Sequence, residues 1–348
     1  MLKRKIIIDT DCGSDDAVAI MAALSDPNTE IIAITVVWGN VCVDQGMENI
    51  GKLLDHYNID IPFYKGADES LLGLHETTAW GGFGSDGFGD AAIPNSKRVA
   101  KQSKLHAAVA LTHILRDIKK KKDEVYQLVC LGPLTNIAIA LRLDADAFKV
   151  LGSETELGIT VMGGTSEGKG NSSMAAEFNF LSDPEAAFAV LNHRTAMPIQ
   201  LIPWEPSVQC PMSWAHYDKW IGRGSSEPRN PTQEFIDKIF KRLEIFTRPD
   251  EDGKKADTGD AEVTQDITCV VPDPVAIVVA LHPEVVLESF ITHCSIELHG
   301  RETRGALCID WYGTNSSMEK RGRWRNCKMI TRVDNEKFIS ILNRIVQK

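Results

Sequence analysis

The sequence contains no C-x-x-C pair and no long uninterrupted apolar run. Most of its eight cysteines stand singly within apolar segments (Cys42, Cys130, Cys269 and Cys308), so we expect reduced core thiols and neither a zinc site nor a redox pair. No apolar stretch approaches the roughly 20 residues of a membrane span, and no signal-peptide apolar region follows Lys3-Arg4-Lys5. These absences predict a cytoplasmic protein without a membrane partner.

Basic residues are fewer than acidic ones, with 38 Lys and Arg against 48 Asp and Glu, which gives a net charge of −10. A negative charge repels nucleic acid and anionic membranes, so we expect neither as a partner. The only basic run, residues 119–122, precedes two acids and is predicted to be a solvated helix end. A neutral or cationic small substrate suits this charge better. With 43% hydrophobic residues in 348, the chain can bury a large core.

An apolar run, residues 6–8, is followed by four carboxylates within eight positions, which are Asp9, Asp11, Asp15 and Asp16. The run predicts a buried strand, Gly13 a turn and Ser14 a helix cap, so the acids lie at the carboxyl end of a strand. Open α/β sheets bind ligands at that edge, and carboxylates this close repel one another unless a hard cation binds them. The sequence therefore predicts Ca²⁺ or Mg²⁺ here.

A simpler interpretation of the acids stays open. Asp15 and Asp16 could merely favour the positive N-terminus of a helix, with the two earlier acids in a solvated turn. We favour the cation because a tight acidic cluster is costly without a metal or a function. An EF-hand loop is excluded, since Gly13 and Ile20 occupy positions where that motif needs a ligand and its closing glutamate.

Strand and helix patterns alternate along most of the chain, which predicts an α/β fold with a mostly parallel open sheet flanked by helices. After the first strand, predicted strands cover residues 31–37, 61–64, 125–131, 158–162, 197–202, 285–296, 306–309 and 328–333. Residues 203–266 are the least regular part, and we expect a small helical cap or loop insertion there, with one helix over 235–246. The whole chain, 1–348, is predicted to form a single domain.

Three further segments follow predicted strands or precede a predicted helix. The glycine-rich loop 71–94 has no secondary-structure period, and loops of that length are usually functional. Asn171, Glu177 and Asn179 cannot share one helix face, but from an irregular loop they can converge on a ligand with several hydroxyls. A plain surface loop is the alternative.

Asp273 stands between two prolines at a helix start, where it is either a metal ligand or a helix cap.

The segment 9–17, Asp-Thr-Asp-Cys-Gly-Ser-Asp-Asp-Ala, resembles the N-terminal signature of the inosine-uridine preferring nucleoside hydrolases, which split the N-glycosidic bond of ribonucleosides. The similarity continues in the family's order along nearly the whole chain. It runs through Gly39-Asn40, Gly84-Ser85-Asp86-Gly87, Gly132-Pro133-Leu134-Thr135-Asn136, Asn171 with Glu177-Phe178-Asn179, and Asp273-Pro274. One such motif would be weak, but the ordered set is specific.

The resemblance implies hydrolysis of ribonucleosides to free base and ribose at a bound Ca²⁺. Its metal ligands would be Asp11, Asp15, Asp273 and the main-chain carbonyl of Leu131. Asp11 would also be the general base for a calcium-bound water. Five residues would hold the ribose hydroxyls: Asp16, Asn40, Asn171, Glu177 and Asn179. We also expect a role in nucleoside salvage and a homodimer or homotetramer.

This sequence departs from pyrimidine-accepting members of the family at two positions. The histidine expected immediately before the last calcium aspartate is Pro272, and a second expected histidine is Phe83. Trp80, Phe83 and Trp204 lie in segments that could wall the base pocket and stack on a purine, although core packing is at least as good an interpretation of each tryptophan. The departures resemble the purine-specific branch, and we expect purine ribosides to be preferred.

Two other functions fit parts of the sequence. Asp9-Thr10-Asp11 after a strand also resembles the nucleophile motif of haloacid-dehalogenase-type phosphatases, in which Asp9 would attack phosphorus. Gly13 stands where that motif has Thr or Val, and the phosphatase hypothesis gives no role to the two acids at the helix start. A nucleoside-binding protein without turnover is the other alternative, suggested by Pro272 and Phe83.

Overall fold

The computed structural model describes residues 3–74, 80–119, 123–153, 157–193, 198–249, 269–312 and 324–347. Within these ranges, none of the helices combines the length and the apolar character needed to cross a membrane. Most of the predicted basic run, residues 120–122, lies outside the described residues, as do residues 250–266 of the predicted cap.

Eight strands of the described part form one sheet. The strands among the described residues are β1 (Lys3–Thr10), β2 (Thr29–Val36), β3 (Phe63–Lys65), β4 (Glu124–Cys130), β5 (Ile159–Met162), β6 (Ile199–Ile202), β7 (Val286–Thr292), β8 (Cys294–Ile296), β9 (Leu307–Ile309) and β10 (Cys327–Val333). The sheet order is β3-β2-β1-β4-β5-β6-β10-β7, and β8 and β9 form a separate antiparallel pair. All neighbours in the large sheet are parallel except β7 and β10. The predicted fold class is confirmed.

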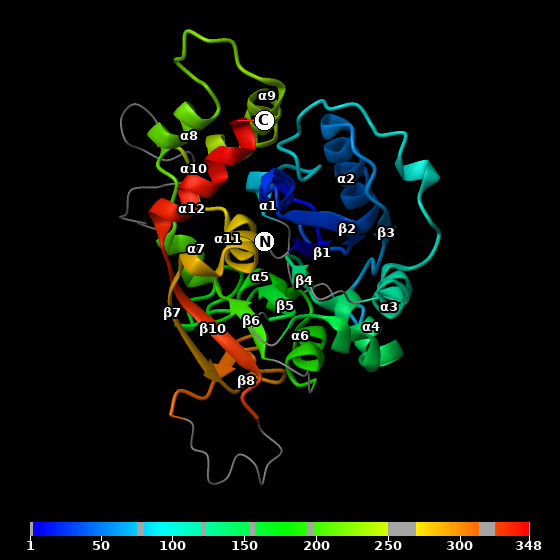
Figure 1. The fold of residues 1–348 in the computed structure, drawn as a ribbon. Helices are drawn as coiled ribbons and strands as arrows, with labels where there is room; N and C mark the ends of the chain where they lie inside the picture. The colour runs from blue at the N-terminus through cyan, green and yellow to red at the C-terminus, as the bar shows by residue number, and fades with distance from the viewer. Residues whose placement is uncertain are drawn as a thin grey trace.

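Helices cover both faces of this sheet (Figure 1). In the described part of the chain the helices are α1 (Ser14–Ser25), α2 (Val43–Tyr57), α3 (Ala107–Asp117), α4 (Thr135–Asp144), α5 (Phe178–Ser182), α6 (Pro184–Leu191), α7 (Trp204–Gln209), α8 (Trp214–Trp220), α9 (Pro231–Ile239), α10 (Lys241–Thr247), α11 (Pro272–Leu281) and α12 (Asn335–Leu342), with short 3₁₀ turns that include η1 (Gly81–Phe83). Ile6 and Ile8 of β1 pack in one core with α1, α2 and α11, whereas Ile7 packs in the other with α3, α4 and α6. This alternation is the two-residue period of a strand buried on both faces.

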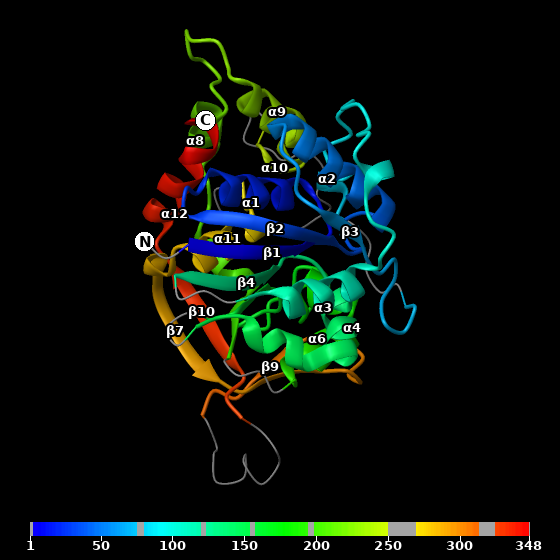
Figure 2. The same ribbon diagram turned by 45° about the vertical axis from the view of Figure 1, so that its right-hand side comes forward.

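The helices α7 to α10 occupy the part of the chain that was predicted to be a cap. Tyr217, Phe235 and Phe240 from this part are buried in the same core as Ile20 of α1 and Ile277 of α11. Figure 1 and Figure 2 both show α9 above α1, on the side of α1 that is away from β1 and β2. The cap and the single-domain organisation stay predictions, and this shared core supports both.

Several local predictions are wrong. The single helix expected over 235–246 is two helices, α9 and α10, and the strand expected over 285–296 is interrupted at His293, so that β7 and β8 join different sheets. Ser14 is the first residue of α1, and Gly13 is its N-cap. Cys42 and Cys308 are exposed rather than buried, because Cys42 caps α2 and Cys308 lies in a sheet of only two strands. All eight cysteines are free thiols.

Candidate active site

The acidic turn joins β1 to α1 at the carboxyl edge of the sheet. β1 ends at Thr10, residues 11–13 form the turn, and α1 begins at Ser14. Cys12 has a φ of +44°, in the left-handed region that is uncommon for residues other than glycine. The four predicted carboxylates of this stretch are all buried. The strand, turn and helix predicted from the sequence therefore place these acids where expected.

Asp11 has one carboxylate oxygen engaged and one free. Its Oδ2 accepts a hydrogen bond from the backbone N–H of Asn40 at 2.6 Å, while its buried Oδ1 makes no hydrogen bond within the described part of the chain. A Cβ atom on Gly132 would lie 3.0 Å from that Oδ1, so the turn after β4 passes directly beside it. Leu131, the predicted carbonyl ligand, therefore lies at the same edge as Asp11.

Asp16 closes the first turn of α1. Its Oδ2 accepts from the backbone N–H of Gly13 at 2.8 Å and from Nδ2 of Asn40 at 3.4 Å, and its Oδ1 accepts from the hydroxyl of Thr10. A carboxylate in this position stabilises a helix start by satisfying a free N–H and by facing the positive end of the helix dipole. Asn40, a predicted ribose contact, thus bonds both Asp11 and Asp16.

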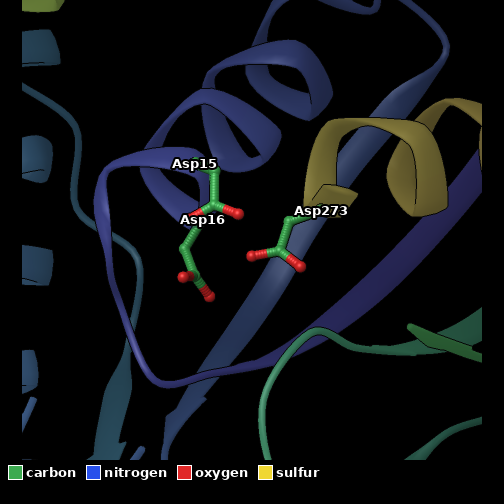
Figure 3. A group of neighbouring side chains, drawn as sticks. All are labelled: Asp15, Asp16 and Asp273. Carbon is green, nitrogen blue, oxygen red and sulfur yellow. The ribbon is translucent and has the colours of Figure 1, made fainter. Parts of the chain in front are cut away.

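The helices α1 and α11 pack together, and each presents acids at its N-terminus (Figure 3). Pro272 is the first residue of α11, Asp273 is the second and Val271 is the N-cap, so Asp273 is not the cap of this helix. One carboxylate oxygen from each of Asp15, Asp16 and Asp273 lies within 4.8 Å of the others. Two segments that are far apart in the sequence thus deliver one buried cluster of acids.

Burial and mutual repulsion make bare carboxylates costly in this cluster. Burial, and after it the neighbouring Asp16, raises the pKa of Asp15 to about 8. Burial and Asp16 raise the pKa of Asp11 well above its ordinary value, and burial and Asp15 do the same for Asp273. The Oδ1 atoms of Asp11 and Asp15 are buried without a hydrogen-bond partner among the described residues. An all-oxygen set of this kind fits a hard divalent cation.

Glu177 and Asn179 lie at the neighbouring strand tips. Oε1 of Glu177 accepts from the backbone N–H of Asn179 at 2.9 Å, and its Oε2 accepts from Gly164 at 2.9 Å and from a second amide of α5 at 3.2 Å. Burial raises the pKa of Glu177 to about 7, against these N–H groups, which favour its charged form. Nδ2 of Asn179 donates to the carbonyl of Leu131 at 2.6 Å. These two side chains are thus fixed to the ends of β4 and β5.

The third member of the predicted sugar-binding loop lies apart from the buried pair. Asn171 is exposed, and its Oδ1 accepts from the backbone N–H of Phe178 at 2.9 Å. Glu177 and Asn179 are both buried. The structure therefore brings two of the three predicted residues together and leaves Asn171 on the surface of the loop.

The aromatic residues form two separate groups. Trp80 and Phe83 meet edge to face with ring centroids 5.2 Å apart, and Phe246 of α10 lies 6.3 Å from Trp80. Phe83 is half-buried against the core, whereas Trp80 is 43% exposed. Trp204 is half-buried at the start of α7, and its backbone N–H donates to the carbonyl of Gly164, next to Glu177. Trp80 is thus the predicted aromatic residue that is most available to a ligand.

The sequence matches the profile of the family described as inosine-uridine preferring nucleoside hydrolase over residues 6–340. The chain belongs to this family. Its structure is similar to that of an inosine-guanosine nucleoside hydrolase, with 58% identity, a TM-score of 0.92 and 99% of each chain covered. A purine-preferring ribonucleoside hydrolase from Gardnerella vaginalis is 26% identical, with a TM-score of 0.77, 99% of this chain and 98% of that chain covered.

Curated relatives align over a shorter part of this chain. Uridine nucleosidase 1 of Arabidopsis thaliana is 37% identical over 188 residues, which are 53% of this chain and 52% of that protein. The chain spans 60% and 52% of the length of two curated relatives that it matches. The family predicted from the ordered motifs is confirmed, and the fold agrees with its solved structures along the whole chain.

Asp9 supports the acidic turn. It is fully buried, and its Oδ1 accepts from the hydroxyl of Thr35 at 2.5 Å and from Nδ2 of Asn136 at 2.9 Å. Burial raises its pKa to about 7, while these two hydrogen bonds oppose the rise. These contacts place Asp9 behind the acidic turn as a support for it. The family sets aside the phosphatase alternative.

Sequence reasoning gave no role to three residues that support the acidic turn. Thr10 bonds Asp16, Thr35 bonds Asp9, and Asn136 bonds both Asp9 and the carbonyl of Val36. Two signals could have found them. Parallel pairing sets Thr35 opposite Asp9 on the adjacent strand, and Asn136 belongs to the turn after β4, which ends at the same sheet edge.

Proposed function

We propose that this chain hydrolyses the N-glycosidic bond of ribonucleosides to free base and ribose, with purine ribosides preferred and a role in purine salvage. The observation that carries the proposal is the buried carboxylate cluster at the sheet edge, beside Glu177 and Asn179. It combines ligands for a hard cation with polar groups for a polyol. The family, and the 58% identity to an inosine-guanosine nucleoside hydrolase, support the same reaction.

The cation site proposed here uses the carboxylates of Asp11, Asp15 and Asp273 and the carbonyl of Leu131, and Ca²⁺ is the proposed ion. When bound, Ca²⁺ supplies a positive charge that makes water easier to deprotonate. Asp16 is also a candidate ligand, because its carboxylate is part of the same oxygen cluster. We propose that the adjacent acids Asp15 and Asp16 divide contact with the metal and with the ribose between them.

Asp11 is the proposed general base. Its Oδ2 is held by the N–H of Asn40, which orients the carboxylate, while its Oδ1 is free to take a proton from the attacking water. Burial raises the pKa of Asp11, which makes the carboxylate a stronger base than an exposed aspartate. The proton is thus proposed to move from the water to Oδ1 as the water attacks the anomeric carbon.

The proposed ribose contacts are Asp16, Asn40, Asn171, Glu177 and Asn179. An ionised carboxylate has about four lone-pair sites, so Glu177 can accept from a sugar hydroxyl in addition to its backbone donors. Such a contact strengthens as the sugar gains positive charge in the transition state. The exposed Asn171 would have to reach the sugar from the loop, which makes it the weakest member of this set.

The base is proposed to contact Trp80, Phe83 and Trp204. Neither Pro272 nor Phe83 can donate a side-chain proton to a leaving base, so a leaving group that is easier to protonate is favoured. A purine offers N7 as a proton acceptor, which a pyrimidine lacks. Two histidines elsewhere in the chain could replace the missing proton donor. The ring of His216 bonds Asn343, and His75 lies outside the described residues. These observations support the purine preference.

The decisive experiment measures ribose release from inosine, guanosine, adenosine, uridine and cytidine with Ca²⁺ present. We expect kcat/KM for the best purine riboside to exceed that for uridine at least roughly tenfold, because a missing proton donor costs about 10²–10⁴-fold. Uridine hydrolysed as efficiently as the best purine riboside would overturn the preference. A protein that binds ribosides with Ca²⁺ and releases no ribose would instead establish the alternative without turnover.

Three further properties belong to the proposal: a cytoplasmic location, a homodimer or homotetramer, and no nucleic-acid or membrane partner. The eight free cysteines suit a reducing compartment. The net charge of −10 disfavours nucleic acid and anionic lipid. The mass in solution, measured by light scattering, decides the oligomeric state.

A further inference from the structure

The residues 80–90, called the base-side segment below, carry Trp80 and Phe83 and lie between the acidic turn and the cap helices. Two backbone carbonyls near its middle, those of Asp86 and Gly87, are bonded by buried side chains from other elements. Its other end contacts α10, where Nε of Arg242 donates to the carbonyl of Gly81 at 2.9 Å. The position of this segment is therefore set by specific contacts.

Asn49 of α2 joins the base-side segment to the acidic turn. It is fully buried, and its Nδ2 donates to the carbonyl of Cys12 at 3.0 Å and to the carbonyl of Asp86 at 2.7 Å. Its Oδ1 accepts from Nε2 of Gln45 at 2.9 Å. Both amide hydrogens are thus used, one on each segment. Asn49 fixes the turn that contains Asp11 directly against the segment that contains Trp80.

Ser14 makes a second link from the same turn. Because Gly13 is the N-cap, the hydroxyl of Ser14 is not needed to cap α1. Its Oγ lies 2.9 Å from the carbonyl of Gly87 and 2.8 Å from the carbonyl of Ile239, the last residue of α9, and the two carbonyls share its single proton. Ser14 is followed directly by Asp15. One side chain therefore ties the start of α1 to both the base-side segment and the cap.

The packing at Gly87 shows how closely these parts meet. Its φ is +75°, and a Cβ atom there would lie 2.8 Å from Cγ1 of Val41, 3.1 Å from Nδ2 of Asn49 and 3.3 Å from the carbonyl oxygen of Cys12. A glycine is therefore required at this point of contact. The segment sits against the acidic turn without room for a side chain between them.

We propose that Ser14 and Asn49 are positioning residues that hold the base-side segment at a fixed distance from the acidic cluster. The proposal rests on the proposed nucleoside hydrolase function and specifies how base recognition is aligned with the reacting carbon. Misplacement of a substrate by about 1 Å can cost roughly 10²-fold in rate. Loss of either link should therefore impair substrates whose base must be engaged by Trp80 and Phe83, and spare substrates that need no such engagement.

The test compares Ser14→Ala and Asn49→Ala with Ser25→Ala, a matched control. Ser25 is a buried serine in the same helix whose hydroxyl bonds only the local carbonyl of Ala22. We expect kcat/KM for inosine to fall at least roughly tenfold more than kcat/KM for p-nitrophenyl riboside, whose leaving group departs without help, in both variants but not in the control. The Ca²⁺ dissociation constant should stay within about twofold of the wild-type value.

Hydrogen exchange supplies a second readout that needs no turnover. In Ser14→Ala, amides of residues 80–90 should exchange faster, while those of α11 should not change. Equal losses on both substrates, a weakened Ca²⁺ affinity or unchanged exchange in the segment would overturn the proposal. If the wild-type protein releases no ribose from any nucleoside, the proposed function fails, and the exchange result alone decides whether Ser14 holds the segment.

Discussion

The acidic cluster and the base-side segment, which carries the proposed base contacts Trp80 and Phe83, lie at the same edge of the sheet but are held in different ways. Asp15, Asp16 and Asp273 are 3%, 0% and 3% exposed, and they stand on two helices that pack together over the sheet. Trp80 is 43% exposed and belongs to a segment held by side-chain contacts to its backbone carbonyls. The proposed catalytic residues are thus part of the core, whereas the proposed base contacts lie on a segment that is attached to the core by side-chain contacts.

This difference predicts where substitutions act. A change in the cluster should remove turnover for every substrate, because the proposed general base and the proposed cation ligands would serve all of them. A change in the base-side segment should alter the order of kcat/KM among nucleosides. It should leave the hydrolysis of an activated substrate such as p-nitrophenyl riboside unchanged. Glu177 stands between these extremes, since it is buried like the cluster and is a proposed contact of the sugar.

The largest effect is expected from Asp11→Asn. This change removes the proposed base and a cation ligand, so kcat on inosine should fall about 10²–10⁴-fold or more, with the fold retained because repulsion in the cluster decreases. Removal of Ca²⁺ by EDTA should abolish turnover in the wild type, and added Ca²⁺ should restore it. Initial rates and circular dichroism measure both outcomes. Full activity after exhaustive chelation would rule out the cation.

Two comparisons make the Asp11 experiment specific. Asp146→Asn is the control, because Asp146 is exposed and pairs only with Lys149, and it should leave the rate unchanged. Calcium titration of Asp15→Asn and Asp16→Asn then separates the roles of the two neighbours. The variant with the weaker Ca²⁺ affinity identifies the ligand, and the variant with the larger rise in KM identifies the ribose contact.

Much of the cluster was predictable because it follows from local rules. An apolar strand followed by a turn and a helix start places Asp9 to Asp16 at one sheet edge, and the structure agrees. The approach of Asp273 was predictable only through the family resemblance, since packing of α1 on α11 joins residues more than 250 positions apart. The exposure of Asn171 and the two-helix form of residues 231–247 depend on tertiary contacts that no local pattern contains.

The links through Ser14 and Asn49 show the same limit. A serine before two acids at a helix start is the pattern of an N-cap, and the sequence favours that interpretation. The structure instead uses Gly13 as the cap and turns the hydroxyl of Ser14 toward two distant carbonyls. Such contacts cannot be read from spacing, because their acceptors are backbone atoms of other segments.

The next largest effect is expected from Glu177→Gln. A hydrogen bond from a sugar hydroxyl to a charged acceptor is worth about 1.5–3 kcal/mol, so kcat should fall roughly 10–100-fold with a smaller change in KM. The structure adds a cost in stability, because both oxygens accept backbone N–H groups and a glutamine would turn its NH₂ toward one of them. We expect a loss of about 1–3 kcal/mol in the free energy of unfolding.

Glu205→Gln separates these two effects of the Glu177 change. Glu205 is also buried and accepts from the backbone N–H groups of Ser166 and Glu167, but it has no proposed contact with the sugar. It should lose similar stability in chemical denaturation with a much smaller loss in kcat. Ribosides and 2′-deoxyribosides hydrolysed at equal rates by the wild type would show that the hydroxyl contacts are not made.

The smallest effect is expected from Trp80→Ala. Stacking on an aromatic ring contributes about 0.5–1.5 kcal/mol beyond area burial, so kcat/KM for inosine should fall about tenfold, while p-nitrophenyl riboside should be cleaved at nearly the wild-type rate. Trp311→Ala is the matched control, because Trp311 is also exposed and pairs with Phe290, on the outer strand β7. If kcat/KM for both substrates fell equally, Trp80 would be a residue that supports the core. A selective loss on purine ribosides would show that recognition of the base and the chemistry at the acidic cluster can be separated in this protein.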